Sequence, residues 1–112
     1  MRDKINDPAR LELMREAIGN IEEFISGTES CESLVTNKVL CHAVVYNLQC
    51  IGECSYKLSR EYVSTHQEID WEAIEGLRHV LVHDYYMVDM NTVWEILERD
   101  LPALKRYLET NL

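Results

Sequence analysis

Apolar residues recur every three or four positions along most of the chain, which is the period of amphipathic helices. The first such run follows Asp7-Pro8, a capping residue and a proline suited to the first helical position. It stops at Ser26-Gly27, where glycine favours a helix end. The apolar row of this helix is Leu11, Met14, Ile18, Ile21 and Ile25.

The pattern predicts a second, longer helix from about Ser33 or Thr36 to about Glu61. It carries two adjacent apolar rows, which is typical of a helix that touches neighbours on more than one side. One row is Leu40, Val44, Leu48, Ile51, Ser55 and Leu58, and the other is Val39, Ala43, Tyr46, Cys50 and Cys54. Gly52 lies inside this helix and permits the close approach of another backbone.

Two further helices complete the pattern. Asp70 is placed to cap a third helix that ends near His83-Asp84, and Asn91 or Thr92 is placed to cap a fourth. Pro102 lies inside the fourth helix and is expected to kink it. The inward rows are Trp71, Ile74, Leu77 and Leu81 for the third helix, and Val93, Leu97, Leu101, Leu104 and Leu108 for the fourth, with Trp94 beside them.

Four helices with short connections predict an all-α antiparallel bundle. The 112 residues suit one domain, 1–112, and we find no linker or repeat in them. With 4 glycines and 2 prolines, the chain cannot supply the frequent turns of an all-β sandwich.

Acidic residues outnumber basic ones, with 20 Asp and Glu against 11 Lys and Arg and a net charge of −9. This balance excludes a general electrostatic attraction to nucleic acid or to an anionic membrane. Binding to RNA would therefore need a local cluster of cationic side chains, completed by a second subunit.

No run approaches the roughly 20 apolar residues that cross a bilayer, and residues 1–10 lack the apolar segment of a secretory signal. We therefore expect a cytoplasmic protein with no membrane partner and with reduced cysteines. Cys31, Cys41, Cys50 and Cys54 are expected to be small buried apolar residues, since they form no Cys-x-x-Cys pair.

Candidate chemistry gathers at residues 76–86, near the end of the third predicted helix. His83 can exchange a proton at neutral pH, and Arg78 offers a charged fork suited to phosphate. The same residues also fit a plain polar helix terminus. Residues five apart on a helix differ by about 140° in direction. Either the helix unwinds before His83, or Arg78 and His83 meet their counterparts in a twofold dimer.

The spacing Arg78-x4-His83-x-Tyr85 resembles the signature of the HEPN superfamily, in its HepT-like toxin branch. The resemblance extends from about Ile21 to Leu108. Its further matches are Asn47-Leu48, Ile51-Gly52-Glu53, Trp71, Ile74, Gly76-Leu77-Arg78, Val88-Asp89, Val93-Trp94, Ile96 and Asp100-Leu101-Pro102.

The resemblance implies a four- to five-helix bundle that dimerises through the face carrying the signature. It implies a metal-independent endoribonuclease toxin without a cofactor, acting on RNA and not on DNA. It also implies a cognate antitoxin, a minimal nucleotidyltransferase that transfers AMP from ATP to the signature tyrosine. By position, Arg78 and His83 are the catalytic candidates and Tyr85 is the AMP acceptor.

Supporting roles fall to His79, Asp84, Glu53 and Asn47, with Glu53 placed either to orient Arg78 or simply as a polar residue beside Gly52. Two positions depart from the branch's usual pattern: His79 stands where Asn is common, and Tyr46 stands where Arg is common.

Two other readings stay open. The acidic charge and Tyr46 favour a HEPN binding module that holds a nucleotidyltransferase or a nucleotide without catalysis. Glu75, His79 and His83 recur every four residues, which also permits a metal-binding bundle, although no fourth ligand is identified.

Overall fold

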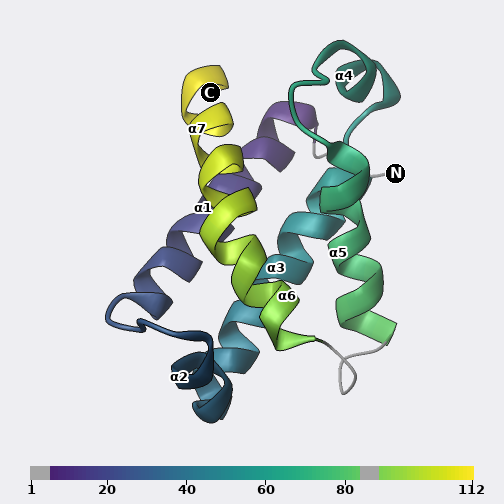
Figure 1. Ribbon diagram of the computed structural model, residues 1–112. Helices are drawn as coiled ribbons and strands as arrows, with labels where there is room; N and C mark the ends of the chain where they lie inside the picture. The colour runs from purple at the N-terminus through teal and green to yellow at the C-terminus, as the bar shows by residue number, and fades with distance from the viewer. Residues whose placement is uncertain (1–5, 84–88) are drawn as a thin grey trace.

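The computed structural model describes residues 6–83 and 89–112, and for residues 79–83 it describes the helical backbone alone (Figure 1). Every regular element in these residues is helical, which confirms the all-α class. The elements are α1 (Asp7–Ile25), α2 (Cys31–Thr36), α3 (Lys38–Tyr56), α4 (Arg60–Thr65), α5 (Trp71–His83), α6 (Met90–Glu95), the π-helical turn η2 (Ile96–Asp100) and α7 (Leu101–Asn111).

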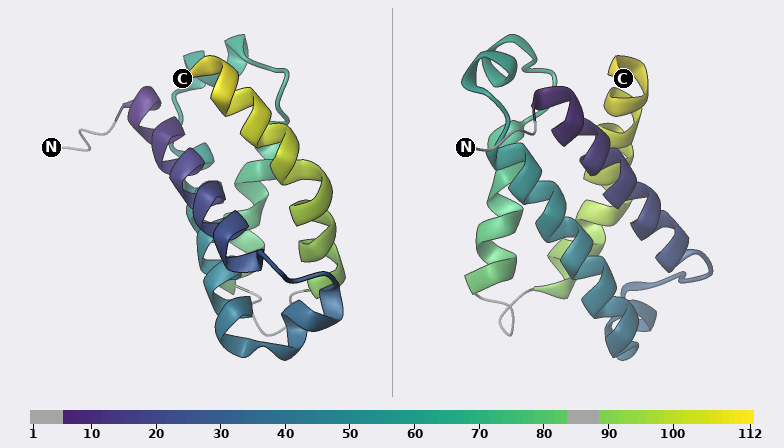
Figure 2. Two further views of the ribbon diagram at one scale, coloured as in Figure 1. Left: turned by 90° about the vertical axis from the view of Figure 1, so that its left-hand side faces the viewer. Right: turned by 180° about the vertical axis from the view of Figure 1, so that it is seen from behind.

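The long helices alternate in direction, with α1 and α5 running one way and α3 and α6–α7 the other (Figures 1 and 2). Helix α3 is central and packs against both α1 and α5, while α7 closes the bundle over α1. The antiparallel bundle is therefore confirmed, and the dimer stays a prediction. The buried core contains Leu11, Met14, Ile18, Ile21, Val44, Leu48, Ile51, Trp71, Val93, Leu97, Leu101, Leu104 and Leu108.

The start of α1 differs from the sequence-based prediction. Asn6 is the N-cap, and its side chain accepts a hydrogen bond from the Ala9 amide at 3.0 Å. Asp7 is instead the first helical residue, and its side chain binds Ser59, which is far from it in the sequence. Its carboxylate accepts bonds from the Ser59 amide at 2.8 Å and the Ser59 hydroxyl at 2.6 Å. The end of α1 is as expected, with Gly27 in the left-handed region at φ 89°.

The prediction of one helix from residue 33 or 36 to residue 61 is wrong, because two capping residues divide it. Asn37 adopts an extended backbone and accepts a bond from the Leu40 amide at 3.1 Å, so α2 ends and α3 begins there. Helix α3 then stops at Tyr56, and Ser59 caps the short helix α4 through the Tyr62 amide at 3.1 Å.

The second apolar row of α3 is only partly internal. Cys54 is buried, but Val39 is 82% exposed and Tyr46 is 65% exposed. Both lie on the outer side of α3, which in the rear view of Figure 2 runs between α5 and α1. The row that contains Val44, Leu48 and Ile51 faces the core as predicted.

The last helical segment begins two or three residues earlier than predicted. Asp89 is the N-cap of α6 and accepts a bond from the Asn91 amide at 2.9 Å, so Asn91 and Thr92 are not the caps. The kink at Pro102 stays a prediction; Pro102 lies in the first turn of α7, directly after the π-helical turn η2. Proline has no N–H and its ring crowds the carbonyl four residues earlier, which explains the wider turn just before it.

Aromatic side chains hold α4 against the start of α5. The Tyr62 and His66 rings stack at 4.0 Å, and the Trp71 indole N–H donates to the His66 carbonyl at 2.6 Å. Tyr62 and Tyr107 share a hydrogen bond between their hydroxyls. Burial and then this hydrogen bond raise the pKa of Tyr107. The start of α5 is thereby fixed against α7, although α4 itself buries no residue fully.

Within the described residues, no helix has the combined length and apolarity needed to span a bilayer.

The clamp between Asp7 and Ser59 generates a test of fold stability. Asp7→Ala removes both hydrogen bonds, and we expect it to lower the free energy of unfolding by about 1–2 kcal/mol. Urea unfolding followed by circular dichroism measures the change. The control is Glu12→Ala, which removes an exposed ion pair to Arg15 at 2.7 Å and should change stability by less than about 0.5 kcal/mol. Equal losses in the two variants would contradict a specific clamp.

Candidate active site

The site is built where α3 and α5 make their closest backbone contact. A Cβ placed on Gly52 of α3 would lie 2.6 Å from the Arg78 backbone nitrogen and 3.1 Å from the Arg78 Cβ. Real Cβ atoms do not approach other atoms that closely, so only glycine fits. The expectation that Gly52 admits a second backbone is confirmed, and that backbone belongs to the candidate catalytic arginine.

Two side chains of α3 hold the Arg78 guanidinium. Its central carbon lies 3.7 Å from the centroid of the Tyr56 ring, which is a cation–π contact. Its Nη1 is 3.9 Å from Oε1 of Glu53. The second carboxylate oxygen of Glu53 is 3.7 Å from Nζ of Lys57, so this carboxylate lies between two cations. The contact to Arg78 fits the suggested orienting role of Glu53.

Arg78 retains capacity for a ligand. Its side chain is 31% exposed, while its Nε is buried and has no hydrogen-bond acceptor among the described residues. An arginine that stacks on a ring through one face and keeps unpaired N–H groups is suited to an anionic oxygen.

Helix α5 is continuous from Trp71 through His83. The helix therefore does not unwind before His83, and one of the two arrangements left open by the sequence is removed. Positions five apart on a helix differ by about 140° in direction. The side chains of His79 and His83, and the whole of Asp84 and Tyr85, lie outside the described residues, and their roles stay predictions.

Asn47 is 7% exposed and occupies a different part of the molecule from the Arg78 contacts. Its amide nitrogen donates to the Ala43 carbonyl at 2.8 Å, and its amide oxygen accepts from Asn20 of α1 at 3.3 Å. The bond from Asn20 joins α3 to α1. The structure thus gives Asn47 a packing role and does not bring it to Arg78.

A pocket of about 460 Å³ lies between α1 and α3 beside this site. Glu53 lines it and also contacts Arg78, so the pocket adjoins the arginine. Tyr46 stands at the pocket with its ring largely exposed, and a hydrogen bond with Cys50 raises the pKa of Tyr46. The remaining lining residues are Leu13, Glu16, Ala17, Asn20, Asn47, Gln49, Cys50 and Cys54.

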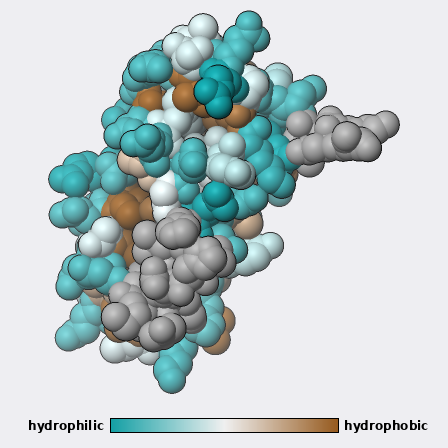
Figure 3. Space-filling view, turned by 90° about the vertical axis from the view of Figure 1, so that its right-hand side faces the viewer, coloured by the Kyte–Doolittle hydropathy of each residue, from teal (hydrophilic) through white to brown (hydrophobic). Residues whose placement is uncertain are grey.

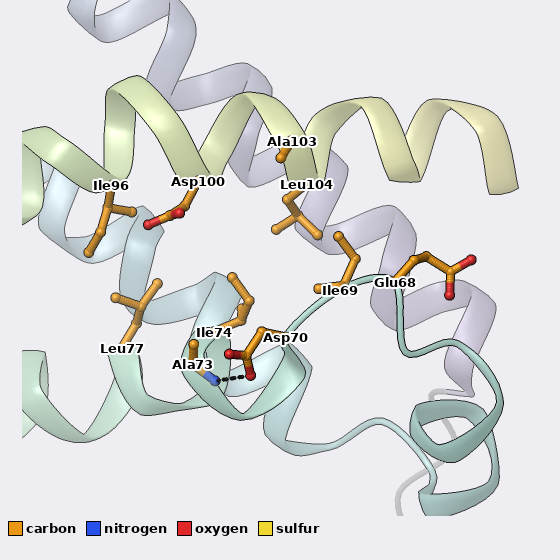
Figure 4. A pocket seen from close by; sticks show the side chains of 10 residues that line it. All are labelled: Glu68, Ile69, Asp70, Ala73, Ile74, Leu77, Ile96, Asp100, Ala103 and Leu104. Carbon is orange, nitrogen blue, oxygen red and sulfur yellow. Dashed lines mark hydrogen bonds between the residues drawn. The ribbon is translucent and has the colours of Figure 1, made fainter.

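A second pocket, of about 350 Å³, lies between the start of α5 and η2–α7 (Figure 4). Its walls are apolar side chains such as Ile74, Leu77 and Leu104, and its polar groups are the carboxylates of Glu68, Asp70 and Asp100. None of its lining residues is basic, so it does not suit a phosphate. Leu77 faces this pocket, whereas the next residue along α5 reaches toward α3.

The side of the molecule seen in Figure 3 is mainly hydrophilic, with small apolar areas between polar side chains. Within the described residues, no three His, Cys, Asp or Glu side chains form a group that could hold a metal ion. The suggested set of Glu75, His79 and His83 is not tested by this, because both histidine side chains lie outside the described residues.

Tyr56 is the site residue that the sequence analysis did not single out. It lies four residues after Gly52 and three after Glu53, on the side of α3 next to α5. That spacing from the glycine was the available signal. From the sequence alone, a tyrosine at a helix end is expected to be an ordinary surface residue, because its arginine partner on another helix is not known.

Comparison with known proteins shows similarity over nearly the whole chain. A family profile described as "Ribonuclease HepT-like" matches residues 14–110. A probable ribonuclease HepT of Thermococcus cleftensis is 36% identical over 100 residues, covering 88% of this chain and 89% of that protein.

Two further relatives have similar descriptions. One from Methanocaldococcus jannaschii, named "Putative RNase", is 29% identical over 94 residues and is matched over 85% of its length by 84% of this chain. One from Caldanaerobacter subterraneus, with the same description, is 32% identical over 80 residues, covering 71% of each chain. No solved structure gives a significant match.

The contact between Gly52 and Arg78 generates a second test. Gly52→Ala should force α3 and α5 apart and lower the free energy of unfolding by about 1–3 kcal/mol. Gly19→Ala is the matched control, because Gly19 is also helical and nothing lies within 4 Å of its added Cβ. We expect the control to be stabilised by about 0.5–1 kcal/mol, from helix propensity. Urea unfolding of both variants decides, and a stabilised Gly52→Ala protein would contradict the close contact.

Proposed function

This chain belongs to the HepT-like ribonuclease family, and from that premise we propose that it is a metal-independent endoribonuclease toxin of a toxin–antitoxin pair. The observation that carries the proposal is the Arg78 guanidinium, which is held against Tyr56 beside Glu53 in a side chain that remains 31% exposed to an anionic ligand. Such a group binds and polarises a phosphodiester.

The proposed reaction is cleavage by the neighbouring 2′-hydroxyl. His83 takes the 2′-hydroxyl proton, the 2′ oxygen attacks phosphorus, and the bond from phosphorus to the 5′ oxygen breaks. The leaving oxygen takes a proton from an acid, for which the second His83 of a dimer is the candidate. Arg78 stabilises the negative charge that develops on the phosphoryl oxygens. The products are a 2′,3′-cyclic phosphate and a free 5′-hydroxyl.

We also propose a twofold homodimer formed through the outer face of α3. Val39 and Tyr46 are 82% and 65% exposed, and because they are seven residues apart they lie on the same side of this helix. Two side chains of the same helix, Glu53 and Tyr56, contact Arg78 of α5. A dimer through this face would bring two Arg78 and two His83 to one cleft, which a chain with a net charge of −9 needs in order to bind RNA.

Regulation is proposed to occur at Tyr85. A cognate nucleotidyltransferase in the cytoplasm transfers AMP from ATP to the Tyr85 phenol: the phenolic oxygen attacks the α-phosphorus, and pyrophosphate leaves. The adduct keeps one negative phosphodiester near Arg78, so it competes with RNA for the same cation and space.

A binding module without catalysis is the second candidate function. The observation that favours it is the Glu53 carboxylate, which lies within 4 Å of both Arg78 and Lys57 and offsets part of their charge. In this reading the site holds a nucleotide or the partner enzyme and does not cleave RNA.

Substitution of the two catalytic candidates tests cleavage. We expect His83→Ala and Arg78→Ala each to slow RNA cleavage by about 10²–10⁴-fold, because each removes one group acting in the transition state. The measurement is the rate of cleavage of total RNA in the presence of a strong chelator. Arg99→Ala is the control, since Arg99 is exposed and its ion pairs among the described residues are with Glu95 and Asp100 on its own segment.

Full activity of the His83→Ala protein would rule out the proposed mechanism, and loss of activity in chelator would favour a metal-dependent reaction. Light scattering on the same preparations should show a dimer at micromolar concentration. Absence of cleavage by the unsubstituted dimer would favour the binding module.

Modification by the cognate nucleotidyltransferase tests regulation. With ATP and Mg²⁺, we expect intact mass to rise by one AMP, and peptide mapping to place it on Tyr85. Tyr85→Phe should accept no AMP, while Tyr86→Phe should be modified as fully as the unsubstituted chain. Modification of Tyr86 alone would show that the acceptor was assigned wrongly.

A further inference from the structure

Three sulfur-containing residues from three helices come together at the end of the bundle where α2, α3 and α6 pack. Cys31 is the first residue of α2, Cys41 lies in the first turn of α3, and Met90 is the first residue of α6. All three are half-buried, so they are fixed by the fold and still reachable. The expectation that the cysteines are simply buried holds for Cys54 and not for these two.

Met90 is the centre of this cluster. Its Sδ lies 3.9 Å from Sγ of Cys41, and its carbonyl oxygen accepts a hydrogen bond from Sγ of Cys31 at 3.4 Å. The Cys31 sulfur is also 3.6 Å from Oδ1 of Asn91. Burial first, and then the electrostatic effect of Cys31, raise the pKa of Cys41.

The chemistry of these ligands selects a class of metal. Thiolates and thioethers are soft ligands that favour ions such as Cu(I). Two sulfur atoms bound to one ion at about 2.3 Å, in a trigonal arrangement, lie about 4.0 Å apart. In the chain without an ion, the Cys41 and Met90 sulfurs are in an S–H···S contact of 3.9 Å, so these two ligands need little movement to bind one ion.

Other metals fit less well. A structural zinc site takes four ligands, usually thiolates and imidazoles, and the described residues contain no group of three His, Cys, Asp or Glu placed to hold an ion. Calcium and magnesium require oxygen ligands. The second thiol pair, Cys50 and Cys54, faces α1 on another part of α3 and has no thioether partner among the described contacts.

We propose that Cys31, Cys41 and Met90 form a binding site for one soft monovalent metal ion, with Cu(I) as its representative. Binding forms two bonds from thiolate sulfur and one from thioether sulfur to the ion, and the two thiol protons leave to solvent. No electron is transferred. Because the ligands come from α2, α3 and α6, the bound ion joins these three helices, and it lies apart from the Arg78 contacts.

The experiment is a titration of the full, reduced chain with Cu(I) in the absence of oxygen, in competition with a coloured Cu(I) chelator. We expect one ion per chain, with sulfur-to-copper charge-transfer absorption in the near ultraviolet. Cys31→Ser and Cys41→Ser should each weaken binding by roughly 100-fold, and Met90→Leu by roughly tenfold, because the thioether is the weaker ligand. Affinity should rise with pH as the thiols lose their protons.

Cys50→Ser is the matched control, since it removes another half-buried thiol from the same helix and should leave affinity unchanged. Thermal unfolding of each apo variant, followed by circular dichroism, shows whether it is folded, and the near-isosteric Met90→Leu is informative even if a serine variant is not. Undiminished binding by the Cys31→Ser and Cys41→Ser chains would overturn the proposal. The proposal would also be overturned if the reduced chain bound no Cu(I) and instead formed a Cys31–Cys41 disulfide in air.

Discussion

The close contact between the α3 and α5 backbones at Gly52 and Arg78 is the constraint on which the site depends. Because no side chain separates the helices there, Arg78 emerges next to the surface of α3 and finds Tyr56 and Glu53 beside it. The glycine weakens the helix that contains it, since it loses more backbone entropy than other residues do. That cost is offset by the packing of Val44, Leu48 and Ile51, which keep the central helix buried along its inner side.

Because burial of a continuous stripe dominates the energetics of a small bundle, the apolar periodicity was sufficient to predict the long helices and most of the core, but not the short helices α2 and α4. It could not place the helix ends. Asn37 and Asn6 cap helices through local side-chain bonds, and neighbouring Asp or Thr residues offer the same chemistry, so the choice depends on tertiary contacts such as that of Asp7 with Ser59. Exposure of Val39 and Tyr46 was also unpredictable, since a period identifies a row and not what covers it.

For the site, the sequence indicated Arg78, Gly52 and Glu53, and the fold brings these three together. The sequence analysis also placed Asn47 among the candidates, but the Asn47 amide oxygen accepts a hydrogen bond from Asn20 of α1. The difference has a simple origin. Asn47 and Glu53 are six residues apart on α3, so their side chains point about 120° from each other. Asn47 therefore contacts Asn20 of α1, whereas Glu53 contacts Arg78 of α5. Tyr56 escaped notice because a cation–π contact has no sequence spacing of its own when its partners lie on separate helices.

The π-helical turn between α6 and α7 determines where this chain can lose one residue without disturbing the core. A π turn holds one residue more than an α turn while advancing the helix by about the same rotation. A chain lacking one residue between Ile96 and Asp100 can therefore close that turn into ordinary α-helix and leave Leu104 and Leu108 on the core side. Elsewhere in the long helices the loss of one residue rotates everything beyond it by about 100° and exposes the apolar row. Among the described helices, this turn is thus where the loss of one residue keeps the register of the core.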